Sequence, residues 1–106
     1  MESNQKIITI EELENIIANS LTEEDIVEIE KLKKNLFFQP KIDCCKKFTI
    51  PQLVQILSTT MIELSENYTR SSYCVKLAIL IYLQEYINKN KTQQTSASLS
   101  LTKNLK

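Results

Sequence analysis

Apolar residues recur at intervals of three and four along most of this chain, and these intervals predict four helices. We expect the helices at about residues 10–20, 23–37, 50–66 and 71–89. The connections between them are short, which favours antiparallel neighbours. The pattern therefore predicts an all-α fold class, a compact four-helix domain that resembles a bundle.

Threonines mark the start of the first three predicted helices. Thr9 and Thr22 are each followed, three residues later, by an acidic residue, Glu12 or Asp25, which is the spacing of a capping box. The helix dipole favours acidic side chains in a first turn. We therefore interpret these carboxylates as structural rather than catalytic. Thr49 is the expected N-cap of the third helix, and Pro51 is tolerated in its first turn.

Three of the predicted helices carry an apolar stripe. The stripe of the first comprises Ile10, Leu13, Ile16 and Ile17. The stripe of the second comprises Ile26, Ile29, Leu32 and Leu36. The stripe of the third comprises Leu53, Ile56, Leu57, Thr60, Met61 and Leu64. Ile62 lies outside the third stripe, so we expect its side chain to be exposed.

The fourth predicted helix is apolar on nearly every face. Between Tyr73 and Ile87 only Lys76, Gln84 and Glu85 interrupt the apolar residues. Such a helix is normally the central one, packed by its neighbours on several sides. The apolar run is too short to cross a bilayer. Membrane contact, and an uncovered face that binds a partner, are the alternatives.

The remaining segments are polar. We expect a flexible N-terminus at residues 1–8, a helical domain at 9–90 and a disordered tail rich in Ser, Thr, Gln and Lys at 91–106. Leu99, Leu101 and Leu105 of the tail could alternatively become ordered on a partner. Residues 39–49 are expected to form a connector that could hold one helical turn, with Pro40 ending the second helix.

Three residue types are absent from the whole sequence, namely glycine, histidine and tryptophan. Without glycine, the phosphate-binding loops that need close backbone approach are excluded. Without histidine, the commonest general base and metal ligand are missing. We therefore expect a protein that is not an enzyme, with no catalytic residues, no cofactor and no metal.

Cysteine usage indicates a reducing compartment. The chain has three cysteines, and Cys44 and Cys45 are adjacent, so a disulfide between them would be strained. Adjacent cysteines also point their sulfurs poorly for one tetrahedral zinc site. The apolar patch near the N-terminus is only three residues long, so no secretion signal is expected. We expect an intracellular, cytoplasmic protein, with a nuclear location as the alternative.

Charge is distributed unevenly although the net charge is zero. Residues 1–40 hold nine acids and four lysines, whereas residues 41–106 hold nine bases and four acids. Two copies could therefore pair head to tail, or one end could steer an oppositely charged partner. Lys41, Lys46 and Lys47 are candidate phosphate contacts. A single arginine and zero net charge argue against nucleic-acid binding.

Residues 50–57 (IPQLVQIL) and 75–83 (VKLAILIYL) together resemble one helical hairpin of a HEAT or armadillo repeat. In that family a proline precedes a leucine-rich first helix, and the second helix carries a valine, basic, alanine and leucine pattern. No second copy follows at a repeat period, so a solenoid is not expected. The resemblance, over residues 50–87, implies a helical scaffold that binds other proteins.

The sequence thus favours a protein–protein interaction module, such as an adaptor, a regulator or a small subunit of an assembly. Its candidate binding residues are Phe37, Phe38, Ile62 and Tyr86, because the helix stripes do not need them and adjacent phenylalanines cannot both easily point inward. The partner is another protein or a second copy of the chain. The alternatives are a viral or parasite host-modulating bundle that binds a host helix, and a nucleic-acid-associated protein that uses the lysines.

Overall fold

The computed structural model describes the backbone of residues 8–105 and the side chains of residues 8–91. Its elements are α1 (Ile10–Ser20), α2 (Glu23–Lys33), α3 (Gln39–Cys44), the 3-10 turn η2 (Cys45–Lys47), α4 (Ile50–Glu66) and α5 (Arg70–Leu105). No strand occurs in this range. The predicted all-α, bundle-like domain is confirmed. The predicted flexible N-terminus lies mostly at residues 1–7, outside the described range.

The predicted caps form as reciprocal hydrogen bonds. The Thr9 hydroxyl accepts the Glu12 N–H at 3.1 Å, and the Glu12 carboxylate accepts the Thr9 N–H at 2.9 Å. The same arrangement opens α2 with Thr22 and Asp25. Thr49 and Gln52 open α4 in the same way. Because each pair satisfies two backbone N–H groups, the start of each of these helices is fixed locally.

The predicted end of the second helix at residue 37 is wrong. α2 ends at Lys33, and the Asn35 side chain accepts the Phe37 N–H at 2.8 Å. This local bond replaces the helical continuation, as short polar side chains commonly do at turns. Leu36 of the predicted stripe is consequently 84% exposed, and Ile26 is also exposed.

The connector contains more helix than one turn. Residues 39–44 form α3 and residues 45–47 continue as η2. Pro40 lies in the first turn of α3 rather than after the end of α2. A first-turn proline has no intrahelical N–H bond to lose, so Pro40 starts a helix here instead of stopping one.

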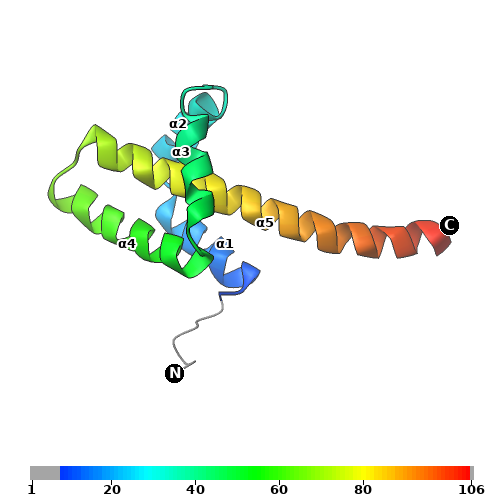
Figure 1. The fold of residues 1–106 in the computed structure, drawn as a ribbon. Coiled ribbons are helices and arrows are strands. Elements are labelled where there is room, and N and C mark those ends of the chain that lie inside the picture. The colour runs from blue at the N-terminus through cyan, green and yellow to red at the C-terminus, as the bar shows by residue number, and fades with distance from the viewer. Residues whose placement is uncertain (1–7, 106) are drawn as a thin grey trace.

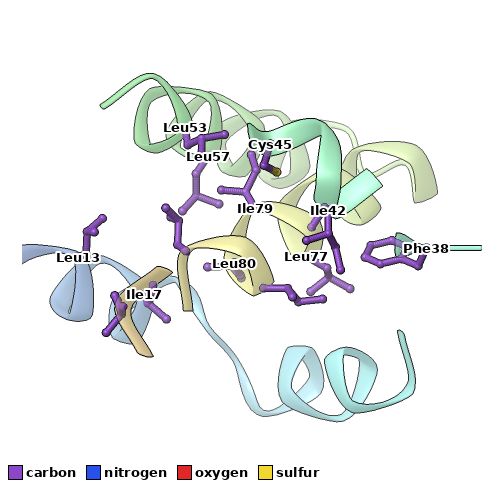
Figure 2. Close-up of a cluster of buried hydrophobic side chains, with 14 of the residues drawn as sticks. Leu13, Ile17, Phe38, Ile42, Cys45, Leu53, Leu57, Leu77, Ile79 and Leu80 are labelled. Carbon is purple, nitrogen blue, oxygen red and sulfur yellow. The ribbon is translucent and has the colours of Figure 1, made fainter. Parts of the chain in front are cut away.

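α5 is the central element of the domain. Every other element packs against it, and α4 lies beside it in the opposite direction (Figure 1). Residues 77–81 of α5 are all buried, and so is Lys76 before them, so this stretch is covered on every face. Figure 2 shows Leu77, Ile79 and Leu80 between the side chains of α1 and those of α3 and α4. The predicted role of the fourth apolar segment as the core helix agrees with this packing.

The last helix continues past the predicted end at residue 89. Its backbone is helical to Leu105, and it projects beyond the other helices (Figure 1). No glycine or proline follows Pro51, so no helix-breaking residue interrupts this backbone. The disorder expected for residues 91–106 stays a prediction, and the side chains of Leu99, Leu101 and Leu105 lie outside the described part.

None of the described helices is long and apolar enough to cross a membrane.

Candidate functional site

An apolar groove lies between three parts of the domain: the α3–η2 segment, α4 and α5. It encloses about 310 Å³. Its apolar lining consists of Phe48, Leu53, Ile56, Val75, Ala78 and Ile79. Phe48 and Val75 are 43% and 40% exposed, so large apolar side chains face solvent at its edge. We call this site the α4–α5 groove.

Small side chains at two lining positions leave the space of the groove unfilled. Ala78 of α5 is 4% exposed and lines the groove together with Cys45, a buried small side chain. A larger residue at either position would occupy the space between α4 and η2. Lys41 and Cys44 complete the lining and are both exposed. The groove is therefore apolar inside with a cation at its edge.

The structure separates the four candidate binding residues. Phe37 is 90% exposed and Ile62 is 60% exposed, as expected for free apolar side chains. Tyr86 is half-buried against the core. Phe38 is 4% exposed and lies beside Ile42 and Leu77 (Figure 2), so its proposed place on the surface is wrong. The turn at Asn35 directs one phenylalanine outward and the other inward, and none of the four lines the groove.

The three candidate lysines are all exposed and belong to the α3–η2 segment, but only Lys41 lines the groove itself. Lys41 lines the groove, and Lys46 lies 3.9 Å from Asp43. Within residues 8–91 the structure records no ion pair for Lys41 or Lys47. Two cationic side chains are therefore available to an acidic ligand on this segment.

The cysteines differ in accessibility. Cys44 is exposed, Cys45 is buried and Cys74 is half-buried, and all three are free thiols. Burial, and secondarily the neighbouring Cys44, raise the pKa of Cys45 to about 11. The part of the chain with described side chains holds no group of three or more Cys, Asp or Glu residues that could bind a metal ion.

Alkylation should distinguish the two adjacent thiols. Because the thiolate is the reactive form, iodoacetamide at about pH 8 is expected to modify Cys44 at least about tenfold faster than Cys45 in the folded protein. In denaturant the two rates should converge. Peptide sequencing by mass spectrometry resolves the two positions. Equal rates in the folded protein would contradict the burial of Cys45.

A buried ion pair joins α2 to α5. Lys76 Nζ lies 2.7 Å from Asp25 Oδ2, and the side chains are 10% and 2% exposed. The Tyr73 hydroxyl donates to Asp25 Oδ1 at 2.8 Å. The Thr22 N–H also donates to Asp25 Oδ2, at 3.1 Å. Both carboxylate oxygens are thus satisfied, as a buried charge requires.

The network determines the protonation of its members. Burial alone raises the pKa of Asp25, but the hydrogen bonds from Lys76, the Thr22 N–H and Tyr73 outweigh it, and the pKa lies below its ordinary value. Burial and the bond to Asp25 raise the pKa of Tyr73 well above that of a free phenol. At neutral pH Asp25 is therefore ionised and Tyr73 keeps the proton that it donates.

Acid should weaken the domain through Asp25. A carboxyl whose pKa is lower in the folded than in the unfolded chain adds stability above its unfolded value of about 3.9. This contribution is lost as the pH falls through the folded value. We expect wild type to lose more unfolding free energy than Asp25→Asn between about pH 6 and pH 3. Urea unfolding at several pH values measures the unfolding free energy of both proteins. If the two free energies fell in parallel with pH, the lowered pKa of Asp25 would be contradicted.

The sequence predicts Asp25 as a cap but does not predict its partner. The available signal was Lys76, the single charged residue between Tyr73 and Leu83, because a buried lysine needs an acid. None of Asp25, Tyr73 and Lys76 lines the α4–α5 groove. We therefore assign them a structural role, which is to hold α2 on α5.

A smaller hollow of about 150 Å³ lies on the other side of α5. Its apolar lining includes Ile17, Ile26 and Leu80, and its edge carries Glu30 and Lys33. These two charges are opposite, so the hollow carries no net charge. It gives less indication of a ligand than the α4–α5 groove does.

Together these features define a small all-helical domain with one central helix and an apolar groove that is cationic at one side. A scan of family models, a search of curated proteins and a search of solved structures each return no match for the chain. The likeness of residues 50–87 to a HEAT or armadillo hairpin therefore stays a resemblance in sequence pattern, and the structure adds that α4 and α5 pack as an antiparallel pair.

Proposed function

We propose that the protein is a non-enzymatic interaction module that binds another protein through the α4–α5 groove. The observation that carries the proposal is the exposed apolar lining, in which Phe48 and Val75 remain about two-fifths exposed beside fully buried neighbours. Contiguous apolar surface with a polar rim is typical of interaction sites. An adaptor, a regulator and a small subunit of an assembly would all use such a site. The three free thiols support a reducing, intracellular location.

A selection from a random peptide library tests the proposal and does not require a named partner. Displayed peptides are selected on the full chain, and each is then measured against Val75→Glu, which places a charge in the groove, and against Ile62→Glu as a matched control on α4. Both positions are exposed, so both variants should fold. We expect selected peptides to bind Val75→Glu at least about tenfold more weakly, a difference of about 1.4 kcal/mol, and to bind Ile62→Glu as wild type.

Two outcomes would contradict the proposal. One is that no peptide is enriched over the starting library. The other is that the enriched peptides bind Val75→Glu as tightly as they bind wild type. Circular dichroism of both variants checks that the helices are retained.

Self-association is the alternative use of the same surface. Light scattering across a concentration series determines the mass of the full chain in solution. The proposal predicts a monomer, because a groove that binds a different protein is not occupied by a second copy of the chain. An oligomer that Val75→Glu dissociates would instead assign the groove to a second copy.

Nucleic-acid binding is a second candidate because Lys41, Lys46 and Lys47 are all exposed on one short segment. Its affinity would fall steeply with salt. The pairing of Lys46 with Asp43 and the single arginine of the chain argue against it.

A further inference from the structure

The charges around the α4–α5 groove all come from one of its walls. Residues 48–62, which include Phe48 and the groove-lining part of α4, contain no charged residue. Between residues 71 and 84 of α5 the single charged residue is Lys76, which is buried against Asp25. The α3–η2 wall, residues 41–47, carries three lysines and one aspartate. The groove therefore combines two neutral walls with one cationic wall.

The cationic wall is available to a ligand. Asp43 is shared with Lys46 at 3.9 Å, an exposed pair of little strength. Lys41 lines the groove itself, and Lys47 lies two residues beyond Cys45. An apolar ligand that carried its own cations next to this wall would meet like charge, which disfavours it. Acidic side chains would be attracted there.

The groove also favours a particular backbone conformation in the peptide that it binds. Its lining consists largely of side chains from helices, whose backbone groups bond within each helix. A bound peptide therefore finds no strand edge on these walls to complete its own backbone hydrogen bonds. A helix satisfies those bonds internally. Its apolar face would then follow the groove between neighbouring helices, with side chains spaced at three and four residues.

We infer that the α4–α5 groove binds an amphipathic helical segment of another protein, with its apolar side chains between η2, α4 and α5 and its acidic side chains facing Lys41 and Lys47. This inference rests on the proposed function and adds to it the chemistry of the partner. The specificity arises from charge, whereas the apolar contacts supply most of the affinity.

Peptides with the same apolar residues but opposite charges test the inference. The tightest peptide from the display selection is synthesised with its apolar residues kept and its other positions changed to mainly Glu or mainly Lys. Fluorescence anisotropy then measures both peptides on the full chain at low and high salt. We expect the acidic peptide to bind at least about tenfold more tightly at low salt, and the difference to shrink as salt screens the charges.

Charge reversal on the protein provides the second arm. Lys41→Glu together with Lys47→Glu should abolish or invert the preference for the acidic peptide. Lys34→Glu together with Lys89→Glu is the matched control, since it makes the same change of net charge at exposed lysines outside the α3–η2 wall. We expect this control to keep the wild-type preference.

The outcomes separate this inference from the proposed function. Equal affinity for the two peptides, or a preference that the Lys41 and Lys47 reversals leave unchanged, would overturn the inference while a loss of binding in Val75→Glu still supports the interaction module. Selected peptides that bind without helical circular dichroism would overturn the helical occupant. A labelled oligonucleotide that binds through Lys41 and Lys47 where peptides do not would overturn it too, and would assign the wall to nucleic acid.

Discussion

Asp25→Ala is expected to lower the unfolding free energy by about 3–5 kcal/mol, because it leaves the buried Lys76 ammonium without its partner. Part of the loss would come from the cap of α2. Glu12→Ala separates this part, since Glu12 occupies the same capping-box position in α1 and is exposed. We expect Glu12→Ala to cost about 1 kcal/mol. Urea unfolding of the three proteins measures these differences.

A double-mutant cycle tests whether the pair itself is responsible. Asp25→Asn keeps an acceptor for the cap, and Lys76→Met keeps most of the length of the side chain. Combined, they should cost less than the sum of the single changes, with a coupling of about 1–3 kcal/mol. Additive costs, or an Asp25→Ala cost no larger than that of Glu12→Ala, would show that the ion pair does not hold α2 on α5.

Leu77→Ala is expected to cost about 2–5 kcal/mol of unfolding free energy. Leu77 is fully buried on α5 and lies near the side chains of α3, so its removal leaves a cavity at the centre of the domain. Ile62→Ala is the control for the same kind of truncation on an exposed surface, and should change stability by less than about 0.5 kcal/mol. Similar costs at the two positions would contradict the assignment of α5 as the core helix.

Helices with complete local signals could be predicted from the sequence. α1 and α4 begin and end where expected, because a threonine cap fixes each start and a clean apolar stripe follows. α2 has an equally good start but ends early, since the Asn35 side chain competes with the helix and Phe38 gains burial in the core. The balance between a local turn and distant packing is not contained in periodicity.

The candidate site could be predicted only in part. The lysines of residues 41–47 are evident candidates in the sequence, and Lys41 does line the groove. The apolar lining is not evident there, because it comes from three separate parts of the sequence. Phe48 follows the polar connector, Leu53 and Ile56 belong to the stripe of α4, and Val75 and Ala78 belong to the apolar run of α5. Their proximity depends on how α3 and η2 cross α5, which no local pattern determines. Phe37 and Phe38 show the same limit, since adjacent identical residues take opposite environments.

The central helix α5 follows all the other described helices in the sequence, and this order has a consequence for synthesis. Until residues 73–87 have left the ribosome, α1 to α4 lack the surface against which each of them packs. The amphipathic faces of α1 and α4 would meanwhile be exposed, a state that is prone to aggregate and to attract chaperones. The domain is therefore expected to fold only after nearly all of its helical residues have been translated, in one late step rather than helix by helix.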